Sequence, residues 1–106
     1  MEEKERSDSE KDETFFKRVR VENRLGLHTR PSTVIVKLLQ GCKNEVFFTH
    51  KEQRVNAKSI LSLLMLAVQK DGEILLEVTG EDASQLIDLL VETFRNKFGE
   101  ESSCGG

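Results

Sequence analysis

Cysteine and long apolar runs are scarce in this 106-residue sequence. The two cysteines, Cys42 and Cys104, fit no spacing typical of a metal site. A disulfide between them is not expected, so a reducing compartment fits better. The longest apolar run, residues 60–68, is about half as long as a membrane span, and the charged N-terminal residues lack the apolar core of a signal peptide. These absences predict a cytoplasmic protein that does not insert into membranes.

An excess of positive charge is also missing. The chain has 16 lysines and arginines against 19 aspartates and glutamates, a formal net charge of −3, and a pI near 5.4. Because no long basic run occurs, we expect no nucleic-acid partner. Arginines nevertheless gather around one short segment, which predicts a local positive field that attracts a phosphorylated or acidic partner. They are Arg18, Arg20, Arg24 and Arg30.

The composition predicts one small globular domain with a polar segment at each end. Apolar residues make up 37% of the chain and charged residues 33%, which is typical of a soluble folded protein. Residues 1–13 are mostly charged and are predicted to form a disordered extension. Residues 100–106 end in serine, cysteine and glycine and are predicted to form a flexible tail. The folded domain is expected over residues 14–99.

The apolar periodicity of this domain predicts the order β-α-β-β-α-β-α. The predicted strands are residues 15–22, 44–49, 53–55 and 73–79, and the predicted helices are residues 29–40, 60–67 and 83–98. Gly41 is expected to end the first helix in a left-handed conformation. Asp82 with Gln85 predicts a capping box at the start of the last helix. Since strands with one apolar face need a helical layer over that face, the fold class is an α+β two-layer sandwich.

The single proline of the chain follows a loop that contains a histidine. Proline is favoured just inside a helix start, so Pro31 places His28 at or just before the first helical turn. Free backbone N–H groups and the positive end of the helix dipole gather there and bind phosphate. Arg30 adds a planar, permanently charged guanidinium group whose N–H donors can bind phosphoryl oxygens. The segment therefore predicts a phosphoryl-accepting histidine, whereas His50 has no such neighbours and is expected to be a surface residue.

Two segments of the chain resemble the HPr family, the histidine-containing phosphocarriers of the bacterial phosphoenolpyruvate-dependent phosphotransferase system. Residues 26–32 read Gly-Leu-His-Thr-Arg-Pro-Ser, and a family member reads Gly-Leu-His-Ala-Arg-Pro-Ala. Residues 55–61, Val-Asn-Ala-Lys-Ser-Ile-Leu, resemble the regulatory serine motif of the family. Ser59 follows His28 by 31 positions, as in the family. The resemblance covers roughly residues 14 to 98.

This resemblance implies both the fold and the roles of the loop residues. It implies an open-faced sandwich in which three helices cover one side of a four-stranded antiparallel sheet. The δ nitrogen of His28 would be the phosphorylated atom and Arg30 its charge partner. Gly26 would allow a close approach of the backbone, Thr29 would replace the usual alanine, and Pro31 would fix the helix start. No metal and no cofactor are expected.

The resemblance also implies the partners. An upstream phosphoenolpyruvate-protein phosphotransferase of the Enzyme I type would donate the phosphoryl group, and sugar-specific or regulatory proteins would accept it. The protein would be a monomer. It would act as a carrier, because no acid/base pair, metal cluster or glycine-rich nucleotide loop in the sequence indicates a stand-alone enzyme. Two alternatives stay open. One is a regulatory binding module controlled at Ser59 without carrier activity, and the other is an unrelated α+β interaction domain.

Ser59 has a structural and a regulatory interpretation. A serine at this position is a good helix N-cap, which alone explains it. The family motif adds phosphorylation by a serine kinase and reversal by a phosphorylase. A phosphoserine at a helix N-terminus suits the fold, yet it places about two negative charges beside a docking partner. Asn56 and Lys58 are expected to shape the preceding turn.

The helix after Ser59 is apolar nearly all the way round, so part of it is expected to remain exposed. Exposed apolar patches usually mark interaction sites. The predicted partner-docking residues are Ile60, Leu61 and Leu64. The predicted core residues of this helix and its C-terminal end are Leu63, Leu66 and Val68.

Overall fold

The computed structural model describes residues 13–99. The extension predicted over residues 1–13 therefore lies outside the described residues except for Glu13, and the tail predicted over residues 100–106 lies wholly outside them. The same holds for Cys104, so the expected absence of a disulfide to Cys42 stays a prediction. Within residues 13–99 no helix is long and apolar enough to cross a membrane.

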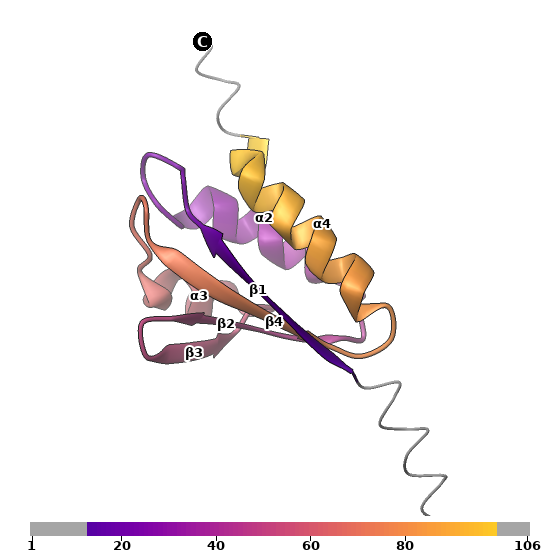
Figure 1. Cartoon of the computed structure of the whole chain (residues 1–106). Helices are drawn as coiled ribbons and strands as arrows, with labels where there is room; N and C mark the ends of the chain where they lie inside the picture. The colour runs from indigo at the N-terminus through magenta and orange to yellow at the C-terminus, as the bar shows by residue number, and fades with distance from the viewer. Residues whose placement is uncertain (1–12, 100–106) are drawn as a thin grey trace, which may run out of the picture.

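The described chain has the predicted element order, with one short 3₁₀ helix added at its end. The strands are β1 (Thr14–Arg20), β2 (Glu45–His50), β3 (Gln53–Asn56) and β4 (Glu73–Thr79). The helices are α2 (Thr29–Leu39), α3 (Ile60–Leu66) and α4 (Ala83–Arg95), and the 3₁₀ helix is η1 (Lys97–Gly99). The strands pair antiparallel in the sheet order β1-β4-β2-β3 (Figure 1).

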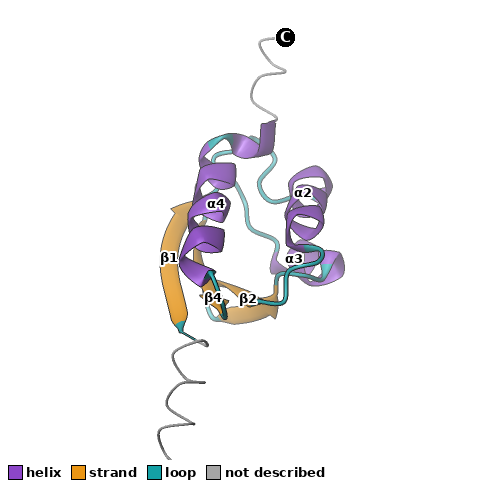
Figure 2. Cartoon of the chain, turned by 90° about the vertical axis from the view of Figure 1, so that its right-hand side faces the viewer, coloured by secondary structure: helices purple, strands orange, loops and turns teal. Residues whose placement is uncertain are grey.

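One face of the sheet is covered by the three helices (Figure 2). Strand β4 shows why, because Ile74, Leu76 and Val78 alternate with polar or half-buried neighbours and are fully buried. The helices complete the core from the other side, where the Phe94 ring of α4 meets the Phe48 ring of β2 edge to face at 5.8 Å between centroids. The predicted open-faced α+β sandwich is confirmed.

The uncovered face of the sheet is held by side chains from neighbouring strands. Glu77 lies between Phe16 and Phe47 in the strand register. The Arg54 guanidinium donates two hydrogen bonds to the Glu77 carboxylate, at 3.0 and 2.9 Å, and stacks on the Phe47 ring at 3.8 Å. The side-chain hydrogen bonds to Glu77 raise the pKa of Arg54 above its ordinary value.

The last helix begins at Ala83 as predicted, but its predicted end and its predicted capping box were wrong. The helix ends at Arg95 and not at Phe98, because Lys97 and Phe98 both have left-handed φ angles, of 54° and 56°. Phe98 nevertheless packs edge to face on Phe94 at 4.8 Å. At the other end Asp82 is the N-cap, but its φ of 59° is left-handed and its side chain makes no capping hydrogen bond, so the capping box is absent from the described chain.

Two other predictions about helix ends are confirmed. Gly41 follows α2 with a φ of +87°, which is the left-handed conformation expected of it. Ser59 is the N-cap of α3, and its Oγ accepts a hydrogen bond from the backbone N–H of Ser62 at 3.2 Å.

Candidate functional site

His28 is the N-cap residue of α2, at the end of the loop that leaves β1. Its backbone is extended, with φ −92° and ψ −160°, and its carbonyl accepts the first helical hydrogen bond from Ser32 N–H at 3.1 Å. Helix geometry leaves the N–H groups of Thr29 and Arg30 without intrahelical acceptors. The half-buried side chain of His28 does not cap the first turn within the described part of the chain. The structure thus confirms the predicted position of His28 at a helix N-terminus.

The loop before His28 is pressed against the backbone that follows α3. Gly26 has a φ of +71°, and a Cβ on it would overlap the Val68 carbonyl oxygen and lie 2.8 Å from Gln69 Cα. Leu27 N–H donates to the same Val68 oxygen at 2.8 Å, and His28 N–H donates to the Gly26 oxygen at 3.0 Å. Only glycine fits position 26 without moving this backbone, so Gly26 sets where His28 lies.

The residues after His28 combine an exposed charge with a buried anchor. Thr29 and Arg30 are exposed, and among residues 13–99 Arg30 makes no ion pair. Pro31 and Ser32 are buried, and Ser32 Oγ finds no hydrogen-bond partner in the described chain. Buried Pro31 fixes the first turn, and this leaves the Arg30 guanidinium able to reach an anion at the helix mouth.

The predicted cluster of arginines is only partly formed around His28. Arg24 lies in the loop and is exposed. Arg18 and Arg20 flank the buried Val19 in β1, and side chains alternate along a strand, so both project from the uncovered face of the sheet and away from the helical layer. The structure therefore brings Arg24 and Arg30 to the loop and leaves the other two on the opposite face.

The serine predicted as a regulatory site lies at the start of α3. Lys58 N–H donates to Asn56 Oδ1 at 2.8 Å, and Lys58 Nζ donates to the Cys42 carbonyl at 2.7 Å, so both residues shape the turn before Ser59, as predicted. Ser59 itself is half-buried, and its hydroxyl is used as the helix cap.

One side of α3 is exposed and apolar. The predicted core residues Leu63, Leu66 and Val68 are buried. Among the predicted docking residues, Ile60 and Leu61 are 37% and 64% exposed, and Leu64 is half-buried. Sequence reasoning did not single out Met65, which is 66% exposed, or Leu25 in the His28 loop, which is 73% exposed. We call Ile60, Leu61, Leu64 and Met65 the α3 patch.

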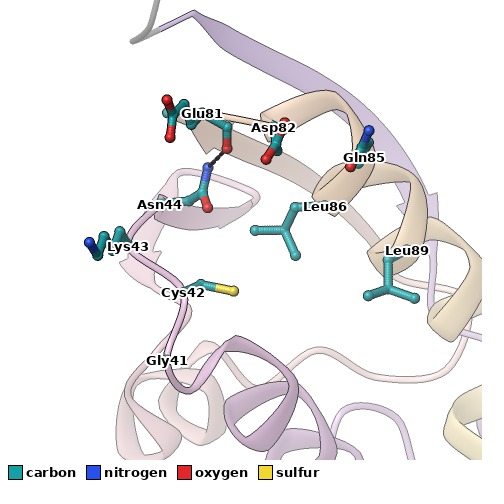
Figure 3. A pocket seen from close by; sticks show the side chains of 10 residues that line it. Gly41, Cys42, Lys43, Asn44, Glu81, Asp82, Gln85, Leu86 and Leu89 are labelled. Atoms are coloured by element: carbon teal, nitrogen blue, oxygen red, sulfur yellow. Dashed lines mark hydrogen bonds between the residues drawn. The ribbon is translucent and has the colours of Figure 1, made fainter.

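A separate cavity of about 730 Å³ is lined by residues outside the His28 loop (Figure 3). It lies between the α2–β2 connection and the start of α4, where Asn44 Nδ2 donates to the Glu81 carbonyl at 2.9 Å. Leu86 and Leu89 form its apolar wall. None of the residues predicted for phosphoryl transfer lines it. His50 is likewise outside the loop, and its Nδ1 lies 2.9 Å from the Glu73 carbonyl oxygen.

The site is thus a histidine at a helix N-terminus, in the helical layer of an open-faced α+β sandwich. The chain matches the family model described as "PTS HPr component phosphorylation site" over residues 16–96. It is 40% identical to phosphocarrier protein HPr of Chlamydia pneumoniae over 80 residues. This matched region covers 76% of this chain and 74% of the relative.

Other relatives agree in sequence and in structure. The HPr of Treponema pallidum is 36% identical over 85 residues, which is 80% of this chain and 97% of the relative. The crystal structure of HPr-C-His from Thermoanaerobacter tengcongensis superimposes with a TM-score of 0.77 at 29% identity, covering 81% of this chain and 97% of that one. The chain belongs to the HPr family of the phosphotransferase system, whose members are phosphocarriers and not stand-alone enzymes.

The contact at Gly26 predicts a large loss of stability in Gly26→Ala. A left-handed alanine and the overlap with Val68 together should lower the free energy of unfolding by about 2–5 kcal/mol. Gly41→Ala is the matched control, since Gly41 has a similar φ of +87° but nothing within 4 Å of the added Cβ. It should lose only about 1–2 kcal/mol. Equal losses for the two variants, measured by urea denaturation, would contradict the close packing at Gly26.

Proposed function

We propose that this protein accepts a phosphoryl group on Nδ1 of His28 and passes it to a second protein. The donor is an upstream phosphoenolpyruvate-dependent phosphotransferase of the Enzyme I type, and the acceptor is a sugar-specific or regulatory protein. The position of His28 at the N-terminus of α2 is the observation that carries this proposal. The same proposal places the protein in the cytoplasm as a monomer.

The transfer balances without an added acid or base. A neutral imidazole with its proton on Nε2 has a lone pair on Nδ1. The donor is a phosphohistidine that is protonated on its other ring nitrogen. As the N–P bond to His28 Nδ1 forms, the N–P bond to the donor imidazole breaks, so the donor ring leaves as neutral imidazole and His28 keeps its Nε2 proton as a phosphoimidazolium. The negative charge on the transferring oxygens meets the backbone N–H groups of Thr29 and Arg30 and the positive end of the helix dipole. These donors are already oriented, so little reorganisation is needed.

The neighbouring side chains support this transfer in different ways. The exposed Arg30 guanidinium can form a bidentate hydrogen bond to two phosphoryl oxygens. Pro31 holds the first turn and contributes no competing N–H. Gly26 keeps the loop against Val68, which fixes the direction in which His28 leaves the loop. The Thr29 side chain, which stands in place of the alanine of the family pattern, is small enough to leave the site open.

The α3 patch and Leu25 are proposed to dock both partners. The end of α3 lies against the His28 loop through the Leu27–Val68 hydrogen bond, so a partner that covers the patch also covers the loop. Exposed apolar residues of this size usually mark an interface. Ser59, at the start of α3, is proposed as the regulatory phosphorylation site of a serine kinase and a phosphorylase, because a phosphate there adds charge at the edge of this interface.

The alternative of a regulatory module without carrier activity has less support. Such a module needs Ser59 and the α3 patch but has no use for a histidine and an exposed arginine at a helix N-terminus. The chain keeps both, with His28 as the N-cap residue of α2.

Phosphorylation with labelled phosphoenolpyruvate and an Enzyme I type donor tests the carrier role. The wild type should gain an acid-labile, base-stable phosphate, and His28→Ala should gain none. His50→Ala is the control and should be labelled at the wild-type rate, because His50 lies outside the His28 loop and its Nδ1 is 2.9 Å from the Glu73 backbone carbonyl. Arg30→Ala should slow labelling about a hundredfold through the lost charge stabilisation. Labelling of His28→Ala at the wild-type level would refute the proposal.

Replacement of Ser59 tests whether charge at this position acts on docking and not on folding. Both Ser59→Asn and Ser59→Asp keep a side chain that caps a helix, so their free energies of unfolding should agree within about 0.5 kcal/mol. Only Ser59→Asp adds a negative charge, and it should raise the KM for the donor enzyme about tenfold. If Ser59→Asn raises the KM equally, or Ser59→Asp leaves it unchanged, charge at Ser59 does not control docking.

A further inference from the structure

Buried polar side chains concentrate in the segment that carries His28. Among residues 13–99, the polar side chains that are buried belong to Asn23, 2% exposed, and Ser32, 0% exposed. Burial of an amide is unfavourable unless hydrogen bonds replace those it makes with water. A buried asparagine five positions before His28 therefore calls for a specific partner.

The partner of Asn23 comes from the far end of the chain. Asn23 Nδ2 donates to the Lys97 carbonyl at 2.9 Å, across 74 positions of sequence. Lys97 is the first residue of η1 and has a left-handed φ of 54°, which turns the chain away from the direction of α4. The Phe98 ring, packed on Phe94 at 4.8 Å, holds this turn in place. The acceptor of the Asn23 amide thus lies on a turn fixed by the core.

From Asn23 a run of backbone hydrogen bonds leads to His28. The Asn23 carbonyl accepts from Gly26 N–H at 2.9 Å, and the Gly26 carbonyl accepts from His28 N–H at 3.0 Å. Leu27, between them, is tied to Val68 at 2.8 Å. The loop is therefore fixed by contacts with two elements, the end of α3 and η1. The hydrogen bond from Asn23 to Lys97 makes the contact with η1.

We propose that Asn23 is a positioning residue for phosphoryl transfer. Its hydrogen bond to Lys97 holds the His28 loop in a fixed position relative to η1. Asn23 does not touch the phosphoryl group. It acts through the Gly26 turn on the direction of His28 and on the approach of the first N–H groups of α2. This inference rests on the proposed role of His28 as phosphoryl acceptor.

Asn23→Ala removes the amide, and Val46→Ala is the matched control. Val46 is buried in β2, at the end of the sheet away from the His28 loop, so its truncation destabilises the core without touching the loop. At a temperature where both are fully folded by circular dichroism, Asn23→Ala should lower the maximal rate of phosphoryl acceptance about tenfold. Its KM for the donor enzyme should stay unchanged, because the α3 patch is intact. Val46→Ala should stay within about twofold of the wild type in both values.

Two outcomes would overturn the positioning role. One is a wild-type maximal rate per folded molecule in Asn23→Ala. The other is an equal loss of rate in Val46→Ala, which would make the effect one of general stability. If Asn23→Ala does not fold, Asn23→Ser takes its place, since its hydroxyl stays polar but is too short to reach Lys97.

Amide chemical shifts separate this inference from the proposed function. The shifts of Gly26 and His28 N–H should change in Asn23→Ala and not in Val46→Ala, and this readout needs no phosphoryl donor. If the wild type takes up no phosphate but the shifts behave in this way, the carrier role fails while the anchoring by Asn23 stands. Unchanged shifts in Asn23→Ala overturn the anchoring itself.

Discussion

The backbone at Gly26 approaches Val68 and Gln69 so closely that no side chain fits at position 26, and the position of His28 depends on this contact. The Leu27–Val68 hydrogen bond and the left-handed Gly26 bring the loop after β1 onto the backbone that follows α3. Leu63 and Leu66 are buried in the core and fix α3 there, so the loop that is hydrogen-bonded to the end of α3 is held in place as well. A helix N-terminus can stabilise a phosphoryl group only if the accepting residue is held in place, and this contact fixes the backbone of His28, the proposed acceptor.

The same contact joins the proposed chemistry to the proposed docking. Exposed Leu61 and Met65 lie on α3, and the backbone that follows α3 is hydrogen-bonded to the loop that carries exposed Leu25 and leads to α2, so one docking surface over both elements is proposed. A partner that buries this surface also excludes water from the transferring group, which strengthens the electrostatic stabilisation there. A charge at Ser59 lies at the start of the same helix, so it would act on the partner and leave the core intact.

Local patterns predicted much of this structure, and long-range contacts account for the rest. The periodicity of β4, the proline after His28 and the serine before α3 each specify local geometry, and each expectation was confirmed. The end of α4 was not predicted, because packing of Phe98 on Phe94 favours a left-handed turn over a further helical turn. The exposure of Met65 and the bond from Asn23 to Lys97 depend on which elements pack together, and no short window of sequence contains that information.

The nitrogen that carries the phosphoryl group is the most direct test of this account. The protein, labelled with ¹⁵N in its imidazole rings and phosphorylated by the donor enzyme, should show a ³¹P–¹⁵N coupling to a single ring nitrogen. This nitrogen should be Nδ1 of His28, the residue at the start of α2. A coupling to Nε2 of His28, or to either nitrogen of His50, would contradict it.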